Sequence, residues 1–138
     1  MFHFYQIPFT DNPERLGYER PEHGVSMTPN IPKSRARGRL YLKSADPREK
    51  PALDFRYFTD EDGYDARTLV DGVKIAREIA RTEPFAGWLK REVFPGPDVT
   101  DDEQLSELLR KAHHTVYHPP APAGWAPSTT NSPSSTPS

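Results

Sequence analysis

The amino-acid composition changes abruptly after His118, and this change sets how much of the chain can form a fold. Residues 119–138 contain six of the sixteen prolines and no charged residue, and most of the others are alanine, serine or threonine. A segment of this kind buries too little apolar surface to offset the entropy that is lost on ordering it. We therefore predict one folded unit over residues 1–118, followed by a disordered tail over residues 119–138.

Composition limits the classes of protein that the chain can belong to. Hydrophobic residues make up 34% of the 138 residues and the mean hydropathy is −0.82, so any core is small, although aromatic residues at 11% partly compensate. The net charge of −2 gives no general attraction to nucleic acid or anionic lipid. The absence of cysteine excludes a disulfide framework, a thiol nucleophile and a cysteine-based zinc site. It is compatible with a reducing compartment, and we expect a cytoplasmic protein without a membrane span.

The first residues of the chain already have a pattern that indicates a β-strand. Residues 1–8 show neither a basic leader nor a signal-type apolar core, and residues 2–7 have the pattern of a strand. A domain that begins at once with a strand indicates that upstream sequence is missing. We expect the chain to be a piece of a larger protein.

The first half of the folded unit favours strands and turns. Val25 and Met27 alternate with polar residues until Pro29 interrupts, which places this short strand near a sheet edge. A clearer strand follows, in which Leu40 and Leu42 point to one side. The predicted extended segments are residues 2–7, 25–28, 38–43 and 52–58, and a turn is predicted at residues 11–13.

The second half favours helices. Apolar residues recur at helical spacing after residue 64 and define one buried stripe, and Pro84 suits the first turn of a short second helix. The run from Thr100 to Glu103 reads as a capping box, with Thr100 as the cap of a third helix. The stripe residues are Ala66, Leu69, Val70, Val73, Ala76 and Ala80 in the first helix, Phe85, Trp88 and Leu89 in the second, and Leu105, Leu108, Leu109 and Ala112 in the third.

After the third helix the chain returns to strand chemistry. Thr115, Val116 and Tyr117 favour an extended segment that delivers His118 just before Pro119. Strands in the first part and helices in the second predict an α+β fold, in which helices cover one face of an antiparallel sheet.

Three histidines cluster near the end of the folded unit. His114 and His118 would share one face of a helix, so a small metal-binding protein that uses His113, His114 and His118 is one interpretation. The strand-favouring residues between them and the following Pro119 argue against that helix. His113 and His114 also suit the negative end of a helix dipole. His118, at a strand end stiffened by proline, is either a catalytic base aimed into a cleft or a packing histidine.

A basic stripe precedes the second strand pattern. Lys33, Arg35, Arg37 and Arg39 alternate, so an extended chain would show them on one face. A phosphate or nucleic-acid patch is one interpretation, but a solvated strand edge is favoured because acidic residues balance the charge and no aromatic residue interleaves. The chain also lacks G-x-G-x-x-G, G-x-x-x-x-G-K-S/T and G-x-S-x-G, and so has no dinucleotide fingerprint, P-loop or nucleophile elbow.

An ordered set of stretches covers most of residues 25–119. It comprises Gly38–Pro47 (GRLYLKSADP), Lys50–Phe58 (KPALDFRYF), a helix with Asp65, Leu69, Gly72 and Arg77, then Glu92–Gly96 (EVFPG), Leu105, Leu109 and His114–Pro119 (HTVYHP). Together these stretches resemble the C-terminal, substrate-binding half of the glucose–methanol–choline (GMC) FAD-dependent oxidoreductases, and choline-dehydrogenase-like members in particular. No single stretch is decisive, and it is their order that carries the resemblance.

The resemblance implies a partial GMC substrate-binding domain and an ancestral oxidation of an alcohol such as choline. It implies that His118 takes the hydroxyl proton while hydride passes from carbon to flavin N5, with the oxidising power supplied by FAD. Because the chain lacks the FAD-binding half of the family, we expect it neither to bind FAD tightly nor to turn over alone. We also expect exposed sheet edges and apolar surface, and hence poor solubility. The alternative is a non-catalytic interaction module that complements a separately encoded flavin-binding half.

The sequence departs from the family after Pro119. The family continues with a run like x-Gly-Thr-Cys-Arg-Met-Gly and later supplies a second histidine or asparagine, whereas this chain reads Pro120–Ala126 (PAPAGWA). Permissible codons for that segment, read from the third base of its first codon, encode Gly-Thr-Cys-Arg-Met-Gly. We therefore hypothesise that the tail is an out-of-frame translation. Sequencing the gene tests this, because a single frame shift near codons 119–120 must then restore the family motif.

Overall fold

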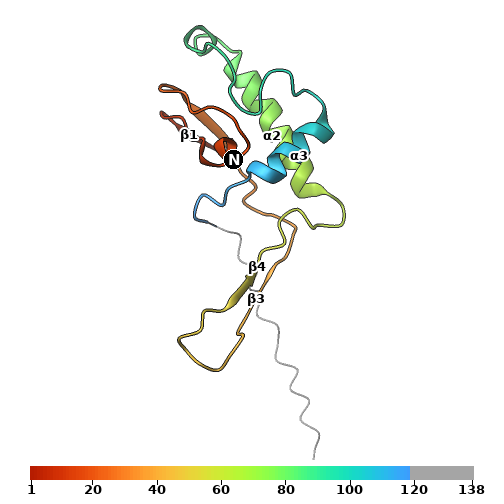
Figure 1. Ribbon diagram of the computed structural model, residues 1–138. Helices are drawn as coiled ribbons and strands as arrows, with labels where there is room; N and C mark the ends of the chain where they lie inside the picture. The colour runs from red at the N-terminus through yellow and green to blue at the C-terminus, as the bar shows by residue number, and fades with distance from the viewer. Residues whose placement is uncertain (119–138) are drawn as a thin grey trace, which may run out of the picture.

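The computed structural model describes residues 1–118 and confirms the predicted α+β fold. Figure 1 shows helices α2 and α3 together beside the β1–β2 sheet, and a β3–β4 hairpin that extends away from this body. The predicted disorder of residues 119–138 lies outside the described residues. The elements are β1 (Phe2–Tyr5), α1 (Asp11–Arg15), β2 (Ser26–Pro29), β3 (Arg39–Tyr41), β4 (Ala52–Asp54), α2 (Tyr64–Ala80), a 3-10 turn (Ala86–Trp88) and α3 (Asp102–Ala112).

The strands pair antiparallel, as predicted, and within residues 1–118 they form two separate two-stranded sheets. In the first sheet Phe2 of β1 lies opposite Pro29 of β2, and in the second Arg39 of β3 lies opposite Asp54 of β4. Strand β2 ends at Pro29, which has no N–H group to donate to a further ladder. Beyond Pro29, Asn30 still donates its N–H to the carbonyl oxygen of Met1 at 2.8 Å and accepts the Met1 amine at 3.4 Å, and the chain then pairs again only after Gly38.

Helix α2 packs against the first sheet because Gly72 lets the helix backbone approach β2. A Cβ atom on Gly72 would lie 2.5 Å from the Cβ of Pro29, which is closer than side chains tolerate. A glycine inside a helix is about 1 kcal/mol less favourable than alanine. The close contact between α2 and β2 offsets this cost and positions the helix over one face of the first sheet.

The core lies between α2 and α3. Val70 and Val73 from α2 meet Leu105 and Leu109 from α3, and Leu105 is fully buried. Burial of one such side chain contributes about 1.5–3 kcal/mol. The predicted stripes of both helices are confirmed at these positions, because apolar residues at helical spacing face the same side. Partly buried side chains that pack against the cluster are Leu69, Phe94 and Val99.

Arg77 of α2 fixes the loop between the last two helical segments. Its guanidinium group binds the Glu92 carboxylate through Nη2 at 2.8 Å and Nε at 3.0 Å. It also donates to the carbonyl oxygens of Gly96 and Val99, at 2.8 and 2.9 Å. Glu92 in turn accepts the amide of Gly96 at 3.1 Å. The loop that contains Gly96 and Val99 is thus held to α2 by one arginine.

Two helix starts differ from the sequence prediction. The predicted turn around Pro13 is the short helix α1, in which the proline sits in the first turn and breaks no intrahelical hydrogen bond. The cap of α3 is Asp101 and not Thr100. The Asp101 carboxylate accepts from the amides of Glu103 and Gln104, both at 3.0 Å. Aspartate ranks above threonine as an N-cap, which explains the shift by one residue.

Two further elements are shorter than predicted. The helix expected to begin at Pro84 is a single 3-10 turn, Ala86–Trp88. The strand expected over residues 52–58 pairs only over its first three residues. Arg56 and Phe58 have φ values of 49° and 59°, and this left-handed backbone cannot continue a strand.

The β3–β4 hairpin leaves apolar side chains uncovered within the described part of the chain. All three β3 residues are exposed, Leu42 just beyond the strand is 73% exposed, and Leu53 of β4 is 54% exposed. Trp88, on the 3-10 turn, is 84% exposed. A two-stranded ribbon with both faces in water is at best marginally stable alone. The expectation of exposed apolar surface is met, and poor solubility stays a prediction. None of the helices in residues 1–118 has the length and apolarity to cross a membrane.

Candidate functional site

His118 follows α3 in a tight turn and not in the predicted strand. The amide of His118 donates to the carbonyl oxygen of Thr115 at 2.9 Å and closes the turn. Its central residues, Val116 and Tyr117, have φ values of 50° and 61°. Two consecutive left-handed residues are the pattern of a type I′ turn. The prediction that residues 115–117 form a strand ending in His118 is therefore wrong.

Local side chains explain why the turn replaces the strand. Nδ1 of His114 accepts the Val116 N–H at 2.8 Å, and Oγ1 of Thr115 accepts the Tyr117 N–H at 3.1 Å. Neither sheet of residues 1–118 includes this segment, so no ladder offers those amides a partner. Side-chain acceptors next to the backbone then compete successfully with the intrinsic strand preference of valine and tyrosine.

His118 is exposed and lines a large open hollow with a volume of about 1730 Å³. The hollow lies between the β1–β2 sheet, α2 and the segment that contains the 3-10 turn. Its walls include the apolar side chains of Ile7, Phe9, Leu69 and Phe94. A small organic molecule could therefore reach the His118 imidazole from the hollow. The assignment of His118 as a catalytic base stays a prediction.

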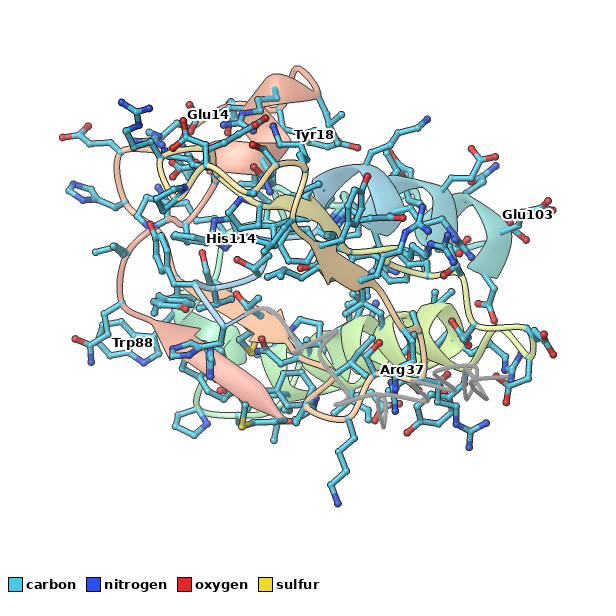
Figure 2. All side chains as sticks on the ribbon, turned by 90° about the horizontal axis from the view of Figure 1, so that it is seen from below. Glu14, Tyr18, Arg37, Trp88, Glu103 and His114 are labelled. Atoms are coloured by element: carbon cyan, nitrogen blue, oxygen red, sulfur yellow. The ribbon has the colours of Figure 1, made fainter. Side chains whose placement is uncertain are left out.

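The imidazole rings of His113 and His114 pack against different aromatic side chains. The His113 ring lies against Tyr57 and Phe58, with centroid distances of 4.9 and 5.3 Å. The His114 ring lies edge-on to Phe9, at 5.4 Å between centroids. Figure 2 shows His114 toward the middle of the molecule, whereas Trp88 lies at its edge. The rings of His113 and His114 thus belong to separate aromatic clusters.

The metal-binding interpretation of His113, His114 and His118 finds no support in this geometry. Nδ1 of His113 lies 2.8 Å from the carbonyl oxygen of Arg110, and Nδ1 of His114 is taken by a backbone amide. Within residues 1–118 no group of three or more histidine, aspartate or glutamate side chains is arranged to hold an ion. The contacts of His113 and His114 are instead those of side chains that organise the end of α3.

Asn12 of α1 anchors the histidine segment and was missed by the sequence analysis. Its Nδ2 donates to the carbonyl oxygens of Ala112 and His113, at 3.3 and 2.7 Å. These carbonyls end α3 and have no intrahelical partner. The residues are a hundred positions apart, so the sequence shows only an asparagine beside a proline, a pattern that by itself indicates a turn.

A second organised group lies at the start of α2. Asp65 is 2% exposed and accepts the amides of Arg35 and Ala36, at 2.8 and 3.0 Å, and the hydroxyl of Ser34. Burial acts to raise the pKa of the Asp65 carboxyl, but these hydrogen bonds outweigh it and the pKa is lowered. The carboxylate therefore ties the segment after β2 to α2. Both carboxylate oxygens are engaged by these donors, so the residue serves the fold.

The basic stripe is occupied by interactions within the chain. Arg35 pairs with Asp62 and its guanidinium group lies 4.0 Å from the Tyr64 ring centroid. Arg39 lies 3.4 Å from the Asp54 carboxylate, and the guanidinium group of Arg37 donates to the backbone. Acidic side chains thus pair with Arg35 and Arg39, and the arrangement matches a solvated edge better than an anion site.

The described residues do not fit a bound flavin dinucleotide. A diphosphate is usually held at a helix N-terminus that follows a glycine-rich turn after a parallel strand. Both sheets in residues 1–118 are antiparallel, and both long helices begin among carboxylates: Asp62 and Asp65 at α2, and Asp101, Asp102 and Glu103 at α3. Such termini repel a diphosphate, so the dinucleotide must be held elsewhere if it is to meet His118.

Comparison with known proteins places the chain in a family. A family model described as GMC oxidoreductase matches residues 32–124. Choline oxidase from Arthrobacter globiformis is 47% identical over 119 residues, which is 86% of this chain and 22% of the relative. An alcohol dehydrogenase (acceptor) from Pseudomonas putida is 35% identical over 120 residues, which is 86% of this chain and 20% of the relative.

A third relative shows the same relation of lengths. An oxygen-dependent choline dehydrogenase from Pseudomonas putida is 38% identical over 98 residues, which is 71% of this chain and 17% of the relative. The chain thus spans about a fifth of the length of the curated relatives it matches. The similarity therefore concerns one segment of each relative and not its full length.

Proposed function

The chain belongs to the GMC oxidoreductase family, and from this premise we propose that it forms part of the substrate-binding domain of an FAD-dependent alcohol oxidoreductase. The observation that carries the proposal is the family match, which spans the α2–α3 body and includes His118. Relatives named choline oxidase and choline dehydrogenase make choline the first alcohol to test. The substrate-binding role also suits the open, largely apolar hollow.

In this proposal His118 accepts the hydroxyl proton of the alcohol. All three neighbouring histidines line the hollow, but His118 is the exposed one, whereas His113 and His114 are tied through Nδ1 to the backbone. An imidazole is suited to proton transfer near neutral pH. The oxidant of such a reaction is the flavin, which would have to be supplied with its own binding polypeptide.

The absence of a dinucleotide site in residues 1–118 makes the chain dependent on a second polypeptide segment. We propose that the chain neither retains FAD nor turns over alone. The exposed β3–β4 hairpin and Trp88 are the apolar surfaces that a flavin-binding partner would cover. A non-catalytic module that only completes the fold of a separately encoded flavin half is the alternative.

Three finer points belong to the same proposal. We propose that the folded unit ends at His118 and that the sequence of residues 119–138 arises from out-of-frame translation. We also propose that the protein resides in the cytoplasm, which suits a chain without cysteine. The gene sequence tests the second point. Cell fractionation tests the third, and recovery in a membrane or secreted fraction would contradict it.

Co-expression tests the proposed function. The 138-residue chain would be produced with the Arthrobacter globiformis choline oxidase from which the matching C-terminal segment has been removed. We expect the two to co-purify as a yellow complex, whereas the chain alone, incubated with FAD and desalted, stays colourless. Retention of flavin by the chain alone would contradict the proposal, as would failure of the two to associate.

The same complex separates the catalytic proposal from its alternative. Anaerobic addition of choline should bleach the flavin absorbance, and His118→Ala should slow this bleaching by about 10²–10⁴-fold while His113→Ala leaves its rate unchanged. His113 is the matched control because its ring contacts the carbonyl oxygen of Arg110, whereas the ring of His114 is bonded to the turn. A yellow complex that choline does not bleach would identify a non-catalytic module.

A further inference from the structure

Two adjacent histidines use the same ring nitrogen in opposite ways. Nδ1 of His113 lies 2.8 Å from the carbonyl oxygen of Arg110, so this nitrogen must carry a proton and donate it. Nδ1 of His114 receives the N–H of Val116 at 2.8 Å, so this nitrogen must be unprotonated. Protonation of the imidazole is therefore compatible with the contact of His113. It is incompatible with the contact of His114, which requires a neutral ring with its proton on Nε2.

The His114 contact holds a backbone conformation that the sequence disfavours. Val116 and Tyr117 have φ values of 50° and 61°, a region that is costly for β-branched and bulky residues. The structure gives each of their amides one side-chain acceptor, Nδ1 of His114 and Oγ1 of Thr115. Without the first acceptor, the strand preference of these residues would act against the turn. The His114 ring thus supports the geometry that sets the position of His118.

The surroundings of the His114 ring keep it in place. It packs edge-on against Phe9 at 5.4 Å and against Tyr117 at 5.6 Å between centroids. The Tyr117 phenol is the titratable group that faces the ring, and Phe9 is apolar. From α1, Asn12 contributes an uncharged amide that binds the preceding backbone. His113 and His118 are the other ionisable side chains of this segment besides Tyr117.

We propose that His114 is a positioning residue whose neutral imidazole holds the 115–118 turn and whose protonation releases it. The position of His118 then depends on pH through a second histidine, in addition to the protonation of His118 itself. The inference rests on the proposed function only in taking His118 as the working base. The turn and its dependence on His114 can be measured without flavin or substrate.

NMR spectroscopy of the full 138-residue chain tests the proposal. A positive φ places the amide hydrogen and Hα of one residue close together, so Val116 and Tyr117 should each give a strong intraresidue amide–Hα NOE. Long-range ¹H–¹⁵N spectra should show the neutral His114 ring protonated at Nε2 and the neutral His113 ring protonated at Nδ1. As the pH falls from about 8 to about 5, where imidazoles titrate, the strong NOEs should be lost together with His114 protonation.

Matched variants assign the effect to His114. Asparagine places an amide oxygen near the position of Nδ1 and does not titrate, so His114→Asn should keep the turn and make it independent of pH. His114→Ala should lose the strong NOEs at every pH, and His113→Asn should leave the pH dependence as in the parent chain. The helical circular dichroism of each variant shows whether α2 and α3 remain folded.

Several outcomes would overturn the inference. In the parent chain, strong NOEs that persist through His114 protonation would do so. So would strong NOEs retained in a folded His114→Ala, or a turn in His114→Asn that still opens at low pH. If His114→Ala does not fold, the parent titration and His114→Asn still decide. A failure of His118 to act as a base would change none of these readouts, so the two proposals fail separately.

Discussion

Replacement of Asp65 by alanine should separate the segment after β2 from α2. The buried carboxylate accepts two backbone amides, from Arg35 at 2.8 Å and Ala36 at 3.0 Å, together with the Ser34 hydroxyl. A buried donor left without its acceptor costs about 1–3 kcal/mol. Because the three donors lie side by side and the losses are not additive, we expect the free energy of unfolding to fall by about 3–5 kcal/mol. That is a large share of the roughly 5–15 kcal/mol by which domains are stable.

Urea unfolding followed by helical circular dichroism at neutral pH measures this loss. Asp71→Ala is the matched control, because Asp71 lies on the exposed face of the same helix. Surface substitutions of that kind change the free energy of unfolding by no more than about 0.5 kcal/mol. Equal unfolding midpoints for Asp65→Ala and Asp71→Ala would refute the assignment of Asp65 as the anchor of this segment.

The same carboxylate predicts a pH dependence with a definite sign. The pKa of Asp65 is lowered in the fold, because hydrogen bonds to the carboxylate outweigh the effect of burial. Its contribution is therefore fully present above the unfolded pKa, about 3.9, and is lost as the pH falls through the lower folded pKa. Asp65→Asn should remove this part of the acid dependence, and an unchanged acid limb in that variant would contradict the reasoning.

Two further substitutions test the packing of α2. Gly72→Ala should lower the free energy of unfolding by about 1–3 kcal/mol, because its Cβ would lie 2.5 Å from Pro29, whereas Gly87→Ala, with its nearest atom at 3.7 Å, should not. Urea unfolding compares them, and equal losses would contradict the close approach of α2 to β2. Arg77→Lys should lower the free energy of unfolding by about 2 kcal/mol, because lysine cannot bind Glu92 through two nitrogens. Thermal unfolding and amide exchange in residues 92–99 measure this, and unchanged exchange would contradict it.

The sequence predicts secondary structure and burial best where apolar residues recur at a regular spacing and all face the same core. The stripes of α2 and α3 are found at the predicted positions, because Val70, Val73, Leu105 and Leu109 have a helical period and a core to face. The cap of α3 was misplaced by a single residue because both Thr100 and Asp101 can cap. Such an error changes nothing in the packing of the helices.

The candidate site was predicted less well because it depends on contacts that sequence patterns do not show. Val116 and Tyr117 favour strands, yet amide acceptors on His114 and Thr115 are one or two residues away and no strand lies beside them. The identity of His118 as the candidate base came from the order of family-like stretches and not from local geometry. The tie from Asn12 to the end of α3 spans a hundred residues and has no local signal.

The proposed role of His118 is that of the base in alcohol oxidation when a flavin is held against it. Its most direct test is a chimera in which residues 1–118 replace the matching segment of the Arthrobacter globiformis choline oxidase, with the relative's own terminal segment retained. Stopped-flow spectroscopy would follow anaerobic reduction of the flavin by choline. We expect reduction in the chimera and a rate lower by about 10²–10⁴-fold in its His118→Ala variant. Equal rates in the two proteins would contradict it.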